Sequence, residues 1–123
     1  MAGLLSAKQK VELSAKLGSL ELRSGYPVVI ATIGSLGGRD LDDVTDELGN
    51  RLGVQHGVLL LIAIKDREVR LAVGDAARKL LTNDEAQRII RQTMYPDLHA
   101  NRFAAGLLKG ADRIIAELSE TQA

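Results

Sequence analysis

Carboxylates gather in the stretch that follows the most hydrophobic part of the chain. Asp75 comes first, and Asp84 and Glu85 follow a few residues later. Oxygen ligands of this kind suit Ca²⁺ or Mg²⁺, so these residues could hold a hard cation. Arg78 stands between them in the sequence and would repel a cation. A simpler interpretation assigns Glu85 to a capping box with Thr82 and makes Asp75 an ordinary turn residue.

Nucleophilic catalysis finds no support in the sequence. His56 is one of two histidines, and its unperturbed pKa of about 6.5 would suit a general base or a pH-dependent binding group. The two histidines lack zinc-like spacing, and a solvated loop histidine is the simpler interpretation. Cysteine is absent, which excludes thiol catalysis, and no P-loop, H-E-x-x-H motif or nucleophile elbow occurs.

A glycine-rich loop, GSLGGRD at residues 34–40, lies between an apolar stretch and a helical pattern. Backbone amides at such a turn often cradle phosphate. Asp40, Asp42 and Asp43 already supply negative charge there, so a phosphate would be repelled unless Arg39 or a cation compensated. A glycine turn with Asp40 as the helix cap is the simpler interpretation.

Length and charge limit the organisation and the partners of the chain. We expect 123 residues with 46% hydrophobic content to form one domain, with its core over about residues 4–118. Lys plus Arg and Asp plus Glu number 16 each, so no global field attracts nucleic acid. We expect no nucleic-acid partner and no transmembrane segment in this chain, and its N-terminus shows no signal-like apolar stretch.

The first half of the sequence predicts a helix, a strand and a second helix. Ser6 and Gln9 have capping-box spacing, and a leucine stripe continues the first helix until just before Gly25. Tyr26–Ile33 is apolar and β-branched, which predicts a buried strand. The second helix begins after Asp40 and ends at Gly53, and its inward positions are predicted to be Leu41, Val44, Leu48 and Leu52.

A hairpin follows. Val58–Ile64 is uninterrupted and apolar, too short for a bilayer but right for a strand that is covered on both faces. Glu68–Val73 alternates between apolar and polar residues, which predicts a strand with one wetter face near the sheet edge. Thr82 and Glu85 then open a third helix that is expected to end at Pro96, and a last helix starts near Arg102.

This order predicts an α/β fold with a small mixed sheet and helices on both faces. A right-handed crossover makes the first two strands parallel, and the hairpin makes the third strand antiparallel. The segments 55–57 and 74–78 and the start of the third helix should therefore meet at one end of the sheet. The loop 34–40 and the hairpin tip 65–67 should lie at the other end.

Three stretches of the chain carry a family resemblance: LSAKQKVELSAKLGSLELRSGYPVVIATIGSLGGRDLDD, GVLLLIAIKDREVRLAVG and LTNDEAQRIIRQTMYPDLHANRFAAGLLKGADRIIAEL. Together they resemble the TPM-domain family, which includes a plant thylakoid acid phosphatase and a photosystem II repair factor. The resemblance implies three family carboxylates at one end of the sheet. Here their positions read Gln55, Arg78 and Asn83, and the loop RLGVQHG is shorter than usual and lacks the family's tryptophan. The scaffold is kept, and its acidic site is rewritten and degenerate.

The resemblance, with these departures, leads us to expect an extracytoplasmic TPM-type interaction module without catalysis of its own. We expect a membrane-associated protein partner, a parent protein that is periplasmic, extracellular or membrane-anchored, and no cofactor. The expected binding residues are Gln55, His56, Asp75, Arg78, Asn83 and Asp84. The alternative is a metal-dependent acid phosphatase like the plant member, working through Ca²⁺ or Mg²⁺ with Asp75 and Asp84.

Overall fold

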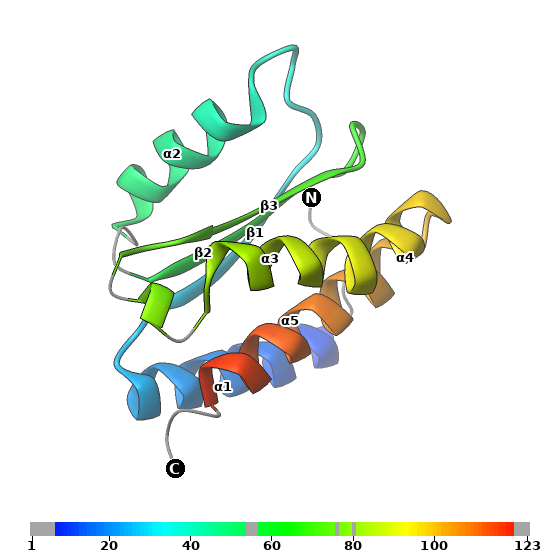
Figure 1. Cartoon of the computed structure of the whole chain (residues 1–123). Coiled ribbons are helices and arrows are strands. Elements are labelled where there is room, and N and C mark those ends of the chain that lie inside the picture. The colour runs from blue at the N-terminus through cyan, green and yellow to red at the C-terminus, as the bar shows by residue number, and fades with distance from the viewer. Residues whose placement is uncertain (1–6, 54–56, 76, 80, 120–123) are drawn as a thin grey trace.

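A three-stranded sheet separates one helix from all the others (Figure 1). The computed structural model describes residues 7–53, 57–75, 77–79 and 81–119. Within them, the strand order is β1 (Val28–Ile33), β2 (Val58–Ala63) and β3 (Glu68–Val73). β1 pairs parallel to β2, and β3 pairs antiparallel to β2. The α/β class, the mixed sheet and the helices on both faces are confirmed.

β2 is the central strand, and all of its residues are buried. Leu60 and Ile62 point to one face of the sheet and join the main core, whereas Leu59 and Leu61 alternate to the other face. This confirms a strand covered on both faces. β1 is an edge strand, and only Val28 in it is buried, so the prediction that it is a buried strand is wrong. The reason is geometric, because a three-stranded sheet has two edges and one interior strand.

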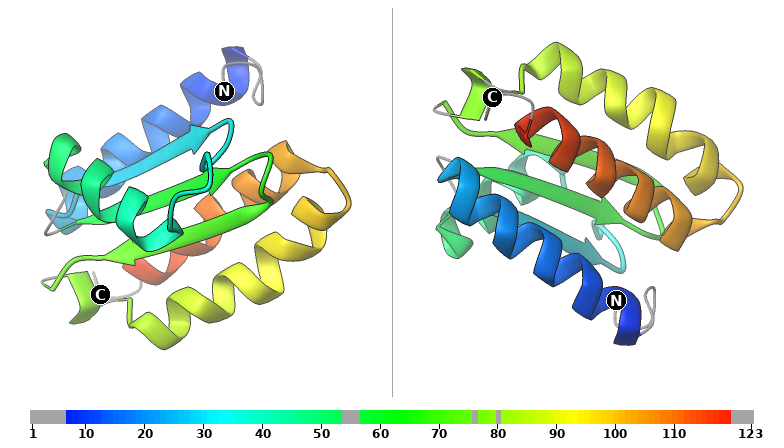
Figure 2. Two further views of the ribbon diagram at one scale, coloured as in Figure 1. Left: turned by 90° about the horizontal axis from the view of Figure 1, so that it is seen from above. Right: turned by 90° about the horizontal axis from the view of Figure 1, so that it is seen from below.

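Helix α2 (Leu41–Leu52) covers the second face by itself (Figure 2). The Asp40 carboxylate accepts hydrogen bonds from the backbone N–H groups of Asp42 and Asp43 in the first turn, and Gly53 ends the helix at a φ of 71°, as predicted. Leu52 is 45% exposed, so its predicted inward position is wrong. Thr45 is buried instead, because its hydroxyl donates to the Leu41 carbonyl oxygen at 2.7 Å and so enters the interior satisfied.

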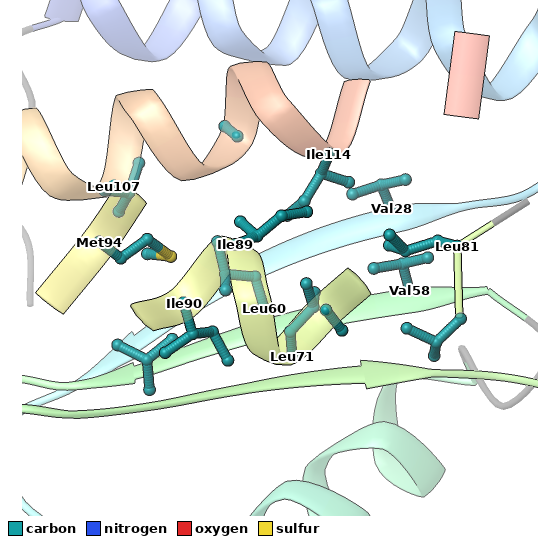
Figure 3. Close-up of a cluster of buried hydrophobic side chains, with 14 of the residues drawn as sticks. Val28, Val58, Leu60, Leu71, Leu81, Ile89, Ile90, Met94, Leu107 and Ile114 are labelled. Atoms are coloured by element: carbon teal, nitrogen blue, oxygen red, sulfur yellow. The ribbon is translucent and has the colours of Figure 1, made fainter. Parts of the chain in front are cut away.

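The remaining helices pack on the first face of the sheet, where most of the core lies (Figure 3). They are α1 (Ala7–Ser24), α3 (Asn83–Ile89), α4 (Tyr95–His99) and α5 (Phe103–Ser119). Sheet residues Leu60 and Leu71 belong to one core cluster with Ile89 of α3, Met94 of the segment between α3 and α4, and Ile114 of α5 (Figure 3). Ser6, the predicted cap of α1, lies outside the described residues.

The helix that opens at Asn83 does not end at Pro96. A π-helical turn, Ile90–Met94, follows α3 and leads into α4, which has Pro96 in its first turn. The first turn of a helix tolerates proline because its N–H would have no intrahelical partner there. The prediction that Pro96 ends the helix is therefore wrong. The π turn ends at Met94, and Pro96 then lies in the first turn of the next helical segment, α4.

The turn between α4 and α5 is held by a buried carboxylate. Asp97 is 4% exposed, and its carboxylate oxygens lie 2.9 Å from Arg102 Nε and 2.8 Å from Lys109 Nζ. Hydrogen bonds from Lys109 and Arg102 lower the pKa of Asp97. A carboxylate that is stabilised in this way ties the start of α5 to α4.

The burial of β2 can be tested with one matched pair of substitutions. Leu60→Ala removes side-chain volume from a position with no exposed surface and should cost about 2–5 kcal/mol of unfolding free energy. Leu52→Ala changes the same side chain at a half-exposed position and should cost less than about 1 kcal/mol. Urea unfolding measures both, and equal losses would contradict a central position for β2.

The Asp97 ion pairs predict a pH-dependent difference between wild type and Asp97→Asn. Because the folded-state pKa is lowered, the stabilisation is complete above the unfolded value of about 3.9 and is lost as the pH falls through the folded value. Urea unfolding over a pH series should therefore show Asp97→Asn to be less stable near neutral pH, with the difference shrinking below about pH 4.

Asp112→Asn is the control for this series. Asp112 lies on α5 with a 64% exposed side chain that is 3.5 Å from Lys16 Nζ, so its removal should change stability little at any pH. A deficit of Asp97→Asn that stayed constant down to about pH 2 would show that the carboxylate charge is not its source.

Candidate functional site

A pocket of about 390 Å³ opens between α2 and the end of β3. It lies on the face of the sheet that α2 covers, away from the main core. Polar and small side chains from α2, β2, β3 and the segment after β3 form its wall. The lining residues are Thr45, Asp46, Gly49, Asn50, Leu59, Arg70, Ala72, Val73, Gly74, Asp75, Arg78 and Asn83.

The structure brings three of the predicted site residues together. Asp75, Arg78 and Asn83 all line the pocket. Asp84 is exposed in the first turn of α3 and is not among the lining residues. Gln55 and His56 lie outside the described residues. The next residue, Gly57, accepts a 2.8 Å hydrogen bond from the N–H of Gly74, which lines the pocket.

Sequence reasoning missed the contribution of α2 and of the polar face of β3. Asp46 and Asn50 are one helical turn apart and therefore lie on the same side of α2. Arg70 stands on the wetter face of β3, which the alternation of that strand had marked. These two patterns were visible in the sequence, but nothing in it showed that they face each other across a hollow.

Two arginines are held in place by both a carboxylate and the backbone of β3. Arg78 Nη1 lies 2.8 Å from Asp75 Oδ1, and its Nε donates to the Val73 carbonyl oxygen at 3.2 Å. Arg70 Nε lies 3.0 Å from Asp42 Oδ1, and its Nη1 donates to the Leu71 carbonyl oxygen at 3.0 Å. The pocket wall is therefore braced by paired charges.

This donor set does not fit a hard cation. The lining holds two carboxylates, Asp46 and Asp75, and two guanidinium groups, so its formal charge is zero. Asp75 is already paired with Arg78. In the part of the chain that the structure describes, no three His, Cys, Asp or Glu residues come together as possible metal ligands. The wall instead offers hydrogen-bond donors beside acceptors, which suits a neutral polar or mixed-charge group.

Glu85, another candidate ligand, is engaged in the cap of α3. Its backbone N–H donates to Thr82 Oγ1 at 3.2 Å, and the Thr82 N–H donates to Glu85 Oε1 at 3.0 Å, so the predicted capping box is confirmed. The Thr82 N–H, and the Thr82 hydroxyl that also donates to Glu85 Oε1 at 3.0 Å, lower the pKa of Glu85, because both bonds favour its charged form. Glu85 therefore serves the start of the helix.

The glycine-rich loop lies at the opposite end of the sheet, beside the hairpin tip. The Leu36 N–H donates to Asp66 Oδ2 at 2.8 Å, and the Lys65 N–H donates to the Gly34 carbonyl oxygen at 2.9 Å. A carboxylate of this protein thus already binds a loop amide that a phosphate would need. This supports the interpretation of a glycine turn with Asp40 as the helix cap.

Comparisons with solved structures agree on the fold. The N-terminal domain of a protein from P. gingivalis superposes with a TM-score of 0.92 at 27% identity, covering 98% of this chain and 80% of that one. The BA42 protein of Bizionia argentinensis superposes with a TM-score of 0.74 at 16% identity, covering 98% of this chain and 85% of that one. The N-terminal domain of the cg2496 protein of Corynebacterium glutamicum superposes with a TM-score of 0.71 at 13% identity, covering 99% of this chain and 76% of that one.

A search of curated proteins found no match. None of the helices among the described residues is both long and apolar enough to cross a membrane. The family model of the TPM domain matches residues 1–117. With nearly the whole chain matched, this protein belongs to the TPM-domain family.

Proposed function

We propose that this TPM domain is a non-catalytic interaction module whose pocket binds a polar segment of a partner protein. The observation that carries the proposal is the double engagement of Arg78, which is paired with Asp75 and bonded to the Val73 carbonyl. A guanidinium fixed in this way puts a positive charge where a cation would have to sit.

The composition of the pocket supports a peptide as the ligand. A peptide presents N–H donors and C=O acceptors in alternation, and the pocket offers guanidinium donors beside the carboxylates of Asp46 and Asp75. Leu59 and Ala72 add an apolar floor. A small number of placed polar groups over an apolar base is the usual composition of a binding pocket.

We place this module outside the cytoplasm, in a periplasmic, extracellular or membrane-anchored parent protein, with a partner at the membrane. The support is the family membership, together with the expectation from the family resemblance that such a domain sits beside a membrane segment. The similar structure from P. gingivalis is the N-terminal domain of its protein, and we propose that this domain is likewise joined to further segments.

Restoring carboxylates should create a cation site. The triple variant Gln55→Asp, Arg78→Glu, Asn83→Asp changes the local charge by about four units, because each amide gains one negative charge and the arginine reversal counts twice. Its melting temperature should rise with Ca²⁺ concentration by mass action, whereas that of wild type should not. Differential scanning calorimetry with and without Ca²⁺ measures this.

A second triple variant controls for charge alone. This control variant carries Gln87→Asp, Arg91→Glu and Gln92→Asp, which make the same charge change at exposed positions after the start of α3. The melting temperature of the control variant should not respond to Ca²⁺. A Ca²⁺ response of the wild type as large as that of the first triple variant would contradict a lost cation site.

The acid phosphatase alternative predicts turnover. The interaction module predicts none: the wild-type domain should hydrolyse a generic phosphomonoester no faster than the background rate from about pH 4 to pH 8, with or without Ca²⁺, Mg²⁺ or Mn²⁺. Metal-dependent hydrolysis that disappears in Asp75→Asn but persists in Asp112→Asn would establish the phosphatase and overturn the module. Both substitutions remove one carboxylate, and Asp112 lies on α5, away from the pocket lining.

Partner binding is tested with a photo-crosslinking amino acid at Asn83, inside the pocket, and at Asp112 as the outside control. In membranes of the source cells, the Asn83 probe should give a discrete cross-linked band that the Asp112 probe does not. Adding Arg70→Ser should weaken that band, since it removes a lining donor. An identical pattern from both probes would contradict binding in the pocket.

A further inference from the structure

The outer face of α1 carries large apolar side chains in water. Val11 is 69% exposed and Leu22 is 90% exposed, and among the described residues Leu52 is the other large hydrophobic with such exposure. The opposite face of α1 carries Leu13 and Leu20, which are buried in the core. The helix therefore has two apolar faces, and the protein itself uses one of them.

The exposed face forms a continuous stripe. Val11 and Leu22 are eleven residues apart, which is within about 20° of three full helical turns, so they lie on one line along α1. Ala15 and Gly18 fall on the same line between them, and both are exposed. We call these four residues the outer stripe. It contains no charged side chain.

Gly18 has no packing role inside this molecule. A Cβ built on Gly18 would meet nothing within 4 Å. Glycine inside a helix destabilises it relative to alanine, so its presence here has no explanation in the packing of the single chain. Close approach of a second helix backbone at Gly18 would supply one, since small residues let helices pack closely.

The order of sizes in the outer stripe is palindromic. It reads large, small, small, large, with spacings of four, three and four residues. A two-fold axis beside the middle of α1 would place Val11 opposite Leu22 of a second copy and Ala15 opposite its Gly18. Self-complementarity of this kind is what an isologous helix pair requires.

Charges beside the stripe fit the same arrangement. Lys10 and Glu21 are also eleven residues apart, so they lie on one flank of the outer stripe at opposite ends. In an antiparallel pair, each Lys10 would lie near Glu21 of the second copy, which is attractive at both ends. Lys16, which is also exposed, lies 3.5 Å from Asp112 of α5 and so pairs within the single chain.

We propose that two copies of this domain associate through the outer stripes of antiparallel α1 helices. The occupant of the stripe is a second copy, because both the size order and the flanking charges complement themselves. One helix pair gives an interface below the size of a stable dimer, so the association is weak and depends on concentration. The proposal stands apart from the pocket, which lies on the other face of the sheet.

Sedimentation velocity of the full chain over about 10 µM to 1 mM tests the dimer. Wild type should shift from monomer to dimer over this range, and Leu22→Glu should remain monomeric with an unchanged melting temperature at low concentration. Lys10→Glu and Glu21→Lys should each weaken association at least about tenfold, and the double variant should restore it, because the pair is reversed but kept.

Gly18→Ala should have opposite effects on the stability of the monomer and on its association. It should raise the melting temperature at low concentration, because alanine favours the helix and meets no clash in the monomer. It should also weaken association, because the added methyl group holds the two helices apart. A wild type that stays monomeric to about 1 mM, or a charge-reversed double variant that fails to associate, would overturn the proposal. Binding to lipid vesicles that is lost in Leu22→Glu, without any dimer, would assign the stripe to a membrane instead.

Discussion

β2 must be covered on both faces, and this constraint organises the molecule. Its residues are all buried, and hydrogen-bonded strands flank it on both sides. Since α2 alone covers one face, the remaining helices must gather on the other, where the main core forms (Figure 2). At the start of β2, a Cβ on Gly57 would collide with Pro27, so the entrances to β1 and β2 approach as closely as glycine allows.

The same constraint leaves β3 with a free edge, and side chains close it. The Gly74 N–H donates to the Gly57 carbonyl oxygen, and in an antiparallel pair only every second residue is hydrogen-bonded to the neighbouring strand. The backbone N–H and C=O groups of Val69, Leu71 and Val73 therefore point away from β2. Arg70 and Arg78 donate to the outward carbonyls of Leu71 and Val73.

Such capping protects an edge strand from pairing with another chain. The two arginines that line the pocket therefore also satisfy carbonyl groups at the outer edge of β3. Tyr95 contributes at the same edge, where its hydroxyl donates to Glu68 at 3.3 Å and bonds to the backbone of Val69. A substitution of Arg78 therefore changes the pocket and uncovers an edge carbonyl at once.

The elements that sequence predicted correctly are those with a strong local cause. The run of buried residues in β2, the Asp40 cap, the glycine stop at Gly53 and the Thr82 capping box are each specified by neighbouring residues. The predictions that failed depend on tertiary packing. Leu52 has the right spacing but lies at the last turn of α2, and Pro96 breaks a regular helix but not one with a π turn.

The candidate site likewise contains residues that could be grouped from the sequence and residues that could not. Asp75, Arg78 and Asn83 could be grouped from the sequence, because strand order and direction bring their segments to one end of the sheet. Asp46 and Asn50 could not, since their place depends on how α2 rotates over the strands. Strand topology is readable from the order of elements, whereas the rotation of a helix about its axis depends on which side chains it buries.

The sheet also keeps the two binding surfaces of the proposals apart. The pocket lies on the face that α2 covers, and α1, which carries the outer stripe, lies on the other side of the sheet (Figure 1). A second copy bound at α1 would therefore leave both pockets open to partners. Two weak sites carried on one dimer bind a paired or membrane-confined partner more tightly than either site alone, because the second contact forms at a high effective concentration. A weak α1 interface and a weak pocket would then reinforce each other where the partner is concentrated, so the strength of binding would depend on partner density.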